Sequence, residues 1–393
     1  MAIGGAPGVY VKEFESGARP IEGVSTSVAG FVGLTEIENE DAINNPVEIN
    51  SWADFKKIFG SYNEEKAPYL PPSVYGFFAN GGKRCYVVRS ESDDAGGYIG
   101  TDGGPGKKKG LYVFKEIDEI SIVCIPGITD PTVQKKMIEH CEELKDRFCI
   151  LDCNIDADNG QVKVQREGLV SDKGFGALYY PWIQVIVEKI TKEGEEEKVE
   201  LDNIFMPPSG YMAGIYARSD TERGVHKAPA NEKVKGVIKL KIPISTEDQD
   251  GLNPEGINCI RKFQGRGIRV WGARTLAPKG SLWKYINVRR LFLYLEESID
   301  ENTQWVVFEP NNYKLWGRVT ATITNFLTTV WRDGALMGKT PEQAFYVKCD
   351  RTTMTQDDID NGKLICEIGV APVKPAEFVI FRITQWTGGL DTE

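Results

Sequence analysis

The sequence lacks the features that mark membrane proteins, secreted proteins and nucleic-acid binders. Across its 393 residues no apolar run approaches the roughly 18–20 residues that a membrane-spanning helix needs. The start of the chain has no charged segment followed by an apolar core, so it does not resemble a signal peptide. A formal net charge of −10 leaves no excess of Lys and Arg for a broad phosphate-binding surface. We therefore expect a protein that is cytoplasmic during assembly, inserts into no membrane, binds no nucleic acid and has proteins as partners.

Groups that carry out catalysis are also scarce. His140 and His226 are the only histidines, and no Gly-x-Ser-x-Gly motif is present. Carboxylates are abundant, but no pair has a spacing typical of acid–base catalysis. We therefore expect no catalytic residues and no enzyme activity.

The eight cysteines lack the dense spacing of a disulfide framework. His140, Cys141, Cys149 and Cys153 are close enough in sequence to suggest a metal site. Cys149 and Cys153, however, are four residues apart on a predicted strand, without the tight turn of a zinc knuckle. We predict reduced core cysteines beside an exposed helical histidine, and no metal.

Two lysine-containing segments resemble phosphate-binding loops only in part. Gly338-Lys339-Thr340 would end a phosphate-binding loop only if a glycine stood five residues before Gly338, and the chain has Asp333 there. The segment 106–110 has no Ser or Thr directly after its first lysine. We therefore expect no nucleotide and no other cofactor.

What the sequence does contain is material for two or three packed domains, with 41% hydrophobic and 26% charged residues. Strand and helix patterns alternate, with helices expected at 51–60 and 72–80 and a strand at 84–89. An apolar run at 120–126, a capped helix to about 147 and a second apolar run at 148–153 predict a β-α-β unit with parallel strands. The fold class is therefore mixed α/β, with mixed sheets flanked by helices.

Three further segments have recognisable patterns. Residues 90–110 are rich in Gly, Asp and Lys, which predicts an exposed surface loop. Residues 183–187 and 199–205 alternate as the two strands of a hairpin. Residues 313–332 place apolar side chains three and four apart, which predicts a helix with one buried face, preceded by an Asn cap and ended by Gly334.

Both termini carry strand patterns that have no obvious local partner. The apolar residues of these two predicted arms are Val9, Tyr10, Val11 and Phe14 at the start, and Phe378, Ile380, Phe381 and Ile383 at the end. A strand without a partner in its own chain is suited to pairing with another chain. We therefore divide the chain into an N-terminal arm (1–24), an α/β domain (25–250), a C-terminal domain (251–376) and a C-terminal strand arm (377–393).

Five basic residues lie close together in this acidic chain: Arg261, Lys262, Arg266, Arg269 and Arg274. One interpretation is a strand with a solvated basic face. The other is a basic surface that contacts an acidic neighbouring protein. The sequence favours neither.

Many short segments, in this order, resemble tail sheath proteins of contractile phages, R-type bacteriocins and extracellular contractile injection systems. They are residues 7–11, 31–35, 77–89, 208–214, 223–231, 256–261, 270–275, 288–291, 308–311 and 372–378. The likeness is nearly continuous over 253–275 and 283–385, and is missing from about 90 to 198. Each motif alone is weak, and their order is specific.

The resemblance implies a structural subunit that forms sixfold rings, stacked as a helix around an inner tube protein, with baseplate and terminator or cap proteins as further partners. It implies that residues 25–250 form the outer or middle domain, with a variable surface at about 90–198, and that residues 251–376 form the inner domain. It also implies that the terminal arms add strands to the sheets of neighbouring subunits. It also implies that the sheath assembles in a metastable extended state and contracts without a nucleotide, with the linkers at 16–24 and 370–376 changing their angles. The particle is then a phage tail or a phage-tail-like particle.

Two alternatives remain. One is a tube or baseplate component of the same machine, against which the chain length and the segments 308–311 and 372–378 argue. The other is a doubly wound α/β enzyme with its site on the unit 120–153, against which the missing glycine fingerprint after Ile125 argues.

Overall fold

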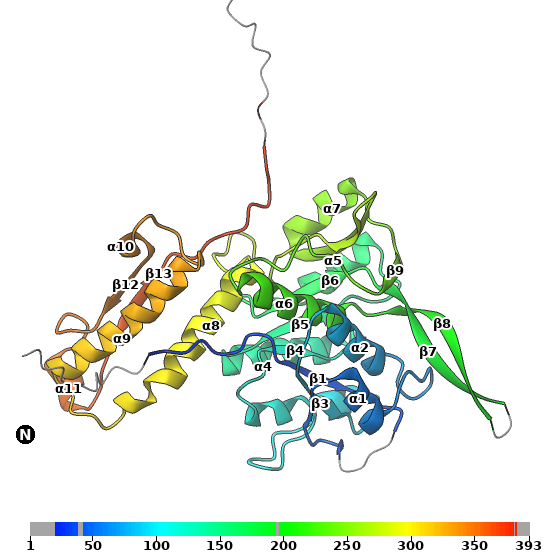
Figure 1. The fold of residues 1–393 in the computed structure, drawn as a ribbon, viewed down its shortest axis with the longest axis horizontal. Coiled ribbons are helices and arrows are strands. Elements are labelled where there is room, and N and C mark those ends of the chain that lie inside the picture. The colour runs from blue at the N-terminus through cyan, green and yellow to red at the C-terminus, as the bar shows by residue number, and fades with distance from the viewer. Residues whose placement is uncertain (1–19, 38–41, 194–195, 381, 383–393) are drawn as a thin grey trace, which may run out of the picture.

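A large mixed sheet forms the centre of the computed structural model, which describes residues 20–37, 42–193, 196–380 and 382 (Figure 1). Its strand order is β11-β10-β6-β5-β4-β1-β3-β2. The strands are β1 (Ala29–Gly33), β2 (Val47–Ile49), β3 (Cys85–Arg89), β4 (Ile122–Cys124), β5 (Phe148–Asp152), β6 (Gly176–Tyr180), β10 (Ile257–Phe263) and β11 (Gly267–Val270). The inner pairs are parallel, whereas β2–β3 and β10–β11 at the two edges are antiparallel. The mixed α/β fold class is confirmed.

The predicted β-α-β unit is present as β4, α4 (Pro131–Leu144) and β5. Asp130 caps the helix by accepting hydrogen bonds from the amides of Thr132 and Val133, and Pro131 occupies the first turn, where its missing N–H costs nothing. Strands β4 and β5 pair in parallel with Ile122 opposite Phe148. Both strands are fully buried, which explains their unbroken apolar sequences.

The helices around the sheet include α1 (Trp52–Phe59), α2 (Leu70–Asn80), α3 (Ala95–Ile99), α5 (Asn159–Glu167), α6 (Ser209–Arg223) and α7 (Thr246–Leu252), with 3-10 turns η2 (Gly110–Glu116) and η3 (Asn253–Glu255). Helices α2 and α6 pack on each other and against β1, β4 and β5. Gly76 and Gly214 allow this close approach, because a Cβ at Gly76 would lie 2.2 Å from the Tyr211 ring and one at Gly214 would lie 2.4 Å from the Phe77 carbonyl oxygen. The apolar interior of this body holds most of the buried hydrophobic residues.

A long hairpin projects from the body, as Figure 1 shows. Its strands β7 (Ile183–Glu193) and β8 (Glu196–Met206) pair over eleven residue positions, so the predicted hairpin is confirmed and is longer than expected. The third strand of this sheet is β9 (Val237–Leu240).

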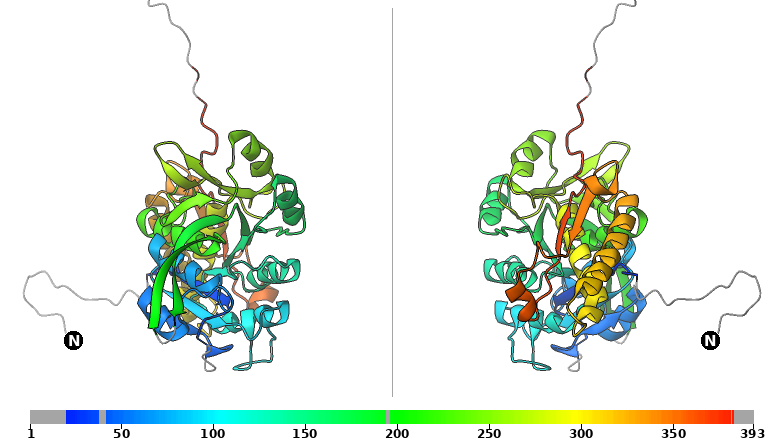
Figure 2. Two further views of the ribbon diagram at one scale, coloured as in Figure 1. Left: turned by 90° about the vertical axis from the view of Figure 1, so that its right-hand side faces the viewer. Right: turned by 90° about the vertical axis from the view of Figure 1, so that its left-hand side faces the viewer.

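The last third of the chain builds a second, smaller apolar cluster beside the body (Figure 2, right). It consists of α8 (Ile286–Thr303), η4 (Gln304–Val306), α9 (Tyr313–Arg332), α10 (Pro341–Ala344), β12 (Phe345–Lys348), α11 (Gln356–Asp360) and β13 (Glu367–Val370). Helix α9 has the predicted bounds, and Asn312 caps it through its Oδ1. None of the helices within the described ranges is both long and apolar enough to span a membrane.

Two local expectations were wrong. Residues 90–110 are not one exposed loop, because Asp94 caps the short helix α3 and the Tyr98 side chain is buried. His140 is not an exposed helical residue, because its side chain is only 3% exposed.

Strands β10 and β11, which follow the boundary predicted near residue 250, continue the large sheet, and the change from one apolar cluster to the other falls within α8. The boundary itself stays a prediction.

Candidate assembly site

The strands β12 and β13 form a small antiparallel sheet whose two outer edges pair with no other strand within the described ranges. One face of this sheet packs on α9 through Phe345, Val347, Ile368 and Val370. The opposite face is open, and Tyr346 there is 52% exposed. Edge strands with free N–H and C=O groups readily accept a strand from another chain.

The chain that follows β13 is held against this region by backbone hydrogen bonds. The Ala371 amide donates to the Ala344 carbonyl at 2.8 Å, and the Val373 amide donates to the Ala335 carbonyl at 3.1 Å. The Asn287 side chain of α8 donates to the Val373 carbonyl at 3.2 Å. Residues 371–373 are therefore part of the folded unit.

Glu377 is the last anchored residue of this segment. It forms a hydrogen-bonded cluster with Arg274, Asn253 and Tyr285, which we call the Glu377 clamp. Arg274 donates from Nε to Oε1 at 2.9 Å and from Nη2 to Oε2 at 2.8 Å. Asn253 donates to Oε1 at 2.7 Å, and the Tyr285 hydroxyl donates to Oε2 at 3.2 Å. Burial raises the pKa of Glu377, but the hydrogen bonds from Arg274 and Asn253 outweigh burial and leave the pKa lowered.

Directly beyond the clamp the side chains lose contact with the body. Phe378, Val379 and Ile380 are 74%, 65% and 81% exposed, and the segment leads away from the fold in Figure 1. Residues 377–380 form no strand in the single chain. Of the other predicted arm residues, Val9, Tyr10, Val11, Phe14, Phe381 and Ile383 lie outside the described residues.

The N-terminal segment is anchored in a similar way, along α8. The Asn302 side chain exchanges two hydrogen bonds with the backbone of Glu22, at 3.3 Å and 3.0 Å. The Val24 amide donates to Ser298 Oγ at 3.1 Å. Ile21 packs against the second apolar cluster.

A buried ion pair fixes the end of this segment. Arg290 and Asp220 lie 2.6 Å apart, with side chains only 3% and 5% exposed. Arg290 also donates to the Thr26 carbonyl at 2.7 Å, and the Thr26 hydroxyl donates to Asp220 at 2.6 Å. No sequence pattern indicates this contact, because its three residues come from distant parts of the chain.

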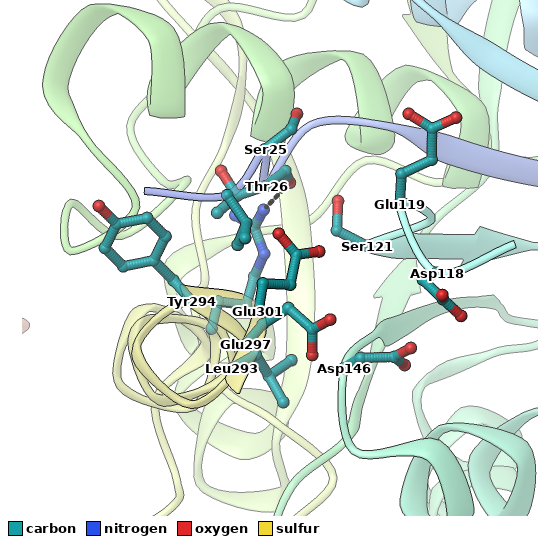
Figure 3. Close-up of a pocket in the computed structure, with 12 residues that line it drawn as sticks. Ser25, Thr26, Asp118, Glu119, Ser121, Asp146, Leu293, Tyr294, Glu297 and Glu301 are labelled. Atoms are coloured by element: carbon teal, nitrogen blue, oxygen red, sulfur yellow. Dashed lines mark hydrogen bonds between the residues drawn. The ribbon is translucent and has the colours of Figure 1, made fainter. Parts of the chain in front are cut away.

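A cavity of about 200 Å³ lies between this segment, α8 and the loops before β4 and β5 (Figure 3). Five carboxylates line it: Asp118, Glu119, Asp146, Glu297 and Glu301. Glu119 pairs with Arg84, and Asp146 pairs with Arg147. Burial, followed by the charges of Asp146, Glu301, Asp300 and Asp118, raises the pKa of Glu297 to about 7. Glu297 is therefore the carboxylate of this cavity whose charge we expect to change near neutral pH.

The structure divides the five predicted basic residues. Arg274 belongs to the Glu377 clamp, and Arg261 donates to the Ile244 carbonyl, Gln249 and Thr246. Arg266 and Arg269 both bind Asn231, and Lys262 is exposed on β10. Four of the five therefore make hydrogen bonds within the chain, and a contact of this basic cluster with a neighbouring protein stays a prediction.

A groove of about 1220 Å³ lies beside the carboxyl ends of β4 and β5. A doubly wound enzyme would bind its ligand at this position. The carboxylate nearest those ends, Asp152, is buried and accepts hydrogen bonds from Ser209 and Gly127. Burial raises its pKa to about 6 against these hydrogen bonds. Asp152 thus ties α6 and the β4–α4 loop to β5. In the described part of the chain, no group of His, Cys, Asp and Glu side chains could hold a metal ion.

Comparison with known proteins agrees with this arrangement. Residues 103–276 match the family of the phage tail sheath protein central domain, and residues 278–385 match the phage tail sheath C-terminal domain. The tail sheath protein of Vibrio phage KVP40 is 29% identical over 192 residues. That match covers 48% of this chain and 28% of the KVP40 protein, so it spans well under half of the relative's length.

Two solved structures are similar along almost the whole chain. The PVC sheath complex of an extracellular contractile injection system, in the contracted state, has a TM-score of 0.79 and 33% identity, covering 98% of this chain and 99% of that chain. The helical sheath of the anti-feeding prophage AFP, also contracted, has a TM-score of 0.76 and 33% identity, covering 98% and 100%. The chain therefore belongs to the tail sheath family of phage tails and contractile injection systems, a family of structural proteins.

Proposed function

We propose that this chain is the subunit of a contractile sheath that surrounds an inner tube and drives it through a target envelope. The observation that carries the proposal is the open-edged β12–β13 sheet beside a C-terminal segment that leaves the fold with exposed apolar side chains. A chain that offers both a free strand sequence and a free strand edge can link to copies of itself. Its relatives are sheath assemblies, which supports the same conclusion.

In this proposal the arm residues at 9–14 and 378–383 add strands to the β12–β13 sheets of neighbouring subunits. About four backbone hydrogen bonds per arm, at roughly 0.5–1.5 kcal/mol each, give a few kcal/mol per contact. Such a contact is repeated along the whole sheath. It can therefore hold the lattice together while the bodies rotate from a metastable extended packing to the contracted one.

The anchors shift the proposed hinges outward. Residues 371–377 and 22–26 are held by hydrogen bonds, so in this proposal the bending predicted for the linkers at 370–376 and 16–24 occurs beyond Glu377 and before Glu22 instead. The proposed partners are other copies in sixfold rings, the inner tube, and baseplate and cap proteins. The subunit acts without catalysis and without a nucleotide, and the particle forms in the cytoplasm.

The test is electron microscopy of the purified chain and of two truncations, one ending at Glu377 and one lacking residues 1–15. We expect hollow, ridged cylinders from the full chain, alone or with its tube protein. Each truncation should remain folded and monomeric, because neither removes an anchoring contact. Cylinders of normal length from either truncation would contradict the arm model, and a full chain without cylinders in the presence of the tube would contradict the sheath function.

A further inference from the structure

The β12–β13 hairpin brings two cysteines opposite each other. Its ladder pairs Phe345 with Val370 and ends with Lys348 opposite Glu367. Cys349 directly follows β12, and Cys366 directly precedes β13. The two cysteines therefore occupy the next cross-strand position. Opposed residues of antiparallel strands have Cβ atoms about 4.5–5.5 Å apart, close to the separation of about 3.5–4.5 Å in a disulfide.

The two thiols are free and in contact. Each side chain contributes to the shifted pKa of the other, as expected for neighbours in the ladder, and no disulfide joins them. Cys349 is buried, whereas Cys366 is only partly buried. Burial raises the pKa of Cys366, and the neighbouring Cys349 side chain opposes that shift. Cys366 is thus the thiol that a dissolved reagent can reach.

The other cysteines provide an internal comparison. Cys85, Cys124, Cys141, Cys149, Cys153 and Cys259 are all buried in the body. Cys141 on α4 and Cys149 on β5 also lie close to each other, but both side chains are fully buried in the core. Both pairs of cysteines therefore lie close together, but only the Cys349–Cys366 pair has a thiol, that of Cys366, which solvent can reach.

We propose that Cys349 and Cys366 form a reversible disulfide that closes when the protein meets a small-molecule disulfide such as oxidised glutathione. The Cys366 thiolate attacks one sulfur of the reagent, forms a mixed disulfide and releases one reduced thiol. The Cys349 thiolate then attacks Cys366 Sγ, which forms the protein disulfide and releases the second reduced thiol. Two protein thiols lose two protons and two electrons, and one reagent disulfide takes them up.

The disulfide closes the loop 350–365 and fixes β12 against β13. This consequence rests on the proposed function, since β12 and β13 carry the edges to which arms of neighbouring subunits are proposed to bind. In a reducing cytoplasm the thiols stay free during assembly. In a released particle the closed disulfide holds the acceptor sheet in one register, so that arms bound to its edges are harder to pull away.

The chemical test uses the purified full-length chain, incubated with oxidised glutathione at pH 8, alkylated under denaturing conditions and mapped by mass spectrometry. We expect a peptide that links Cys349 to Cys366, with Cys141 and Cys149 alkylated. We expect Cys349→Ser to trap glutathione on Cys366, and Cys366→Ser to give neither adduct nor link. Because the closed loop restricts the unfolded chain, oxidation should also raise the Tm by several degrees.

Full alkylation of both cysteines, or a glutathione adduct on Cys366 of the unsubstituted chain that never resolves, would overturn the proposal. Linkage of Cys141 to Cys149 before any linkage at Cys349 would also overturn it, because access would then not decide the reaction. Microscopy of the fully reduced chain keeps the two proposals separate. Cylinders without a disulfide would leave the sheath function intact, and a disulfide without cylinders would remove only its role in the sheath.

Discussion

The Glu377 clamp makes a quantitative prediction for Glu377→Gln. In the wild-type chain the carboxylate accepts two hydrogen bonds from Arg274 and one each from Asn253 and Tyr285, and the side chains of Arg274 and Glu377 are 15% and 18% exposed. A glutamine keeps one oxygen acceptor and presents an NH₂ group where the second oxygen stood. It therefore loses the charge and the paired geometry that the guanidinium recognises.

The expected cost is about 2 kcal/mol, because a hydrogen bond to a charged group contributes roughly 1.5–3 kcal/mol and this site keeps some access to solvent. That cost falls on the docking of residues 371–377, so local opening should become roughly 30-fold more frequent. Hydrogen exchange at the Val373 amide, which bonds to the Ala335 carbonyl, reports this opening directly.

The matched control is Glu255→Gln on the neighbouring turn η3. Glu255 forms an ion pair with Lys279 at 2.8 Å, but the side chains are 34% and 67% exposed, so the change should cost less than about 0.5 kcal/mol. Because the pKa of Glu377 is lowered, its contribution is present above its ordinary pKa and is lost as the pH falls through the lowered value. Equal exchange at Val373 in both variants at pH 7 would refute the clamp as the fixed end of the arm.

Three further predictions concern groups in the interior. The folded chain raises the pKa of Glu297 to about 7, so ionisation of Glu297 costs stability as the pH rises from the ordinary pKa of a glutamate through 7. Glu297→Gln should therefore melt at a higher temperature than wild type at pH 8 and at a similar temperature at pH 5. A larger gain in melting temperature at pH 5 than at pH 8 would contradict this. His140 has no hydrogen-bond partner in the described structure, and burial followed by the charge of Arg147 lowers its pKa to about 3, so wild type loses stability as the pH falls below 6.5. In denaturant titrations His140→Leu should escape that loss and gain roughly 1–2 kcal/mol at pH 5 relative to pH 8, whereas a constant difference would contradict it. Arg290→Met leaves Asp220 buried without its partner and should lower the free energy of unfolding by about 3–5 kcal/mol in the same titrations. The double variant Arg290→Met/Asp220→Leu should recover part of that loss. A loss below about 1 kcal/mol in Arg290→Met would show that the ion pair does not hold α8 to α6.

Local patterns predicted the elements whose determinants are local. The helix at 313–332 was correct because its apolar spacing and its Asn cap lie within the segment itself. The error at His140 was avoidable, since Val133, Met137 and Cys141 mark the buried face of α4 and His140 lies three residues after Met137. The prediction of an exposed loop at 90–110 was wrong because it rested on the many Gly, Asp and Lys residues and disregarded Tyr98, whose buried side chain anchors the segment.

The contacts that hold the two arms were beyond sequence reasoning for a different reason. Arg274 and Glu377 are separated by 103 positions, and Arg290 and Thr26 by 264. A basic cluster and a terminal strand pattern were each visible, but only the fold shows that Arg274 of the cluster binds Glu377, directly before the predicted strand residues. The prediction of arms could therefore be made from the sequence, and the prediction of their fixed ends could not.

Helix α8 connects these fixed ends. Its C-terminal half binds the N-terminal segment through Ser298 and Asn302, and its N-terminal end meets the C-terminal segment through Asn287, with Tyr285 directly before it in the clamp. Between them Arg290 joins the helix to α6 of the body through Asp220. A pull on either arm therefore reaches one continuous helix that is tied to the body by a buried charge pair. Because a packed helix resists bending far more than an exposed chain segment does, we expect the bend to lie outside the anchors and the body with α8 to move as one unit when neighbouring subunits rearrange.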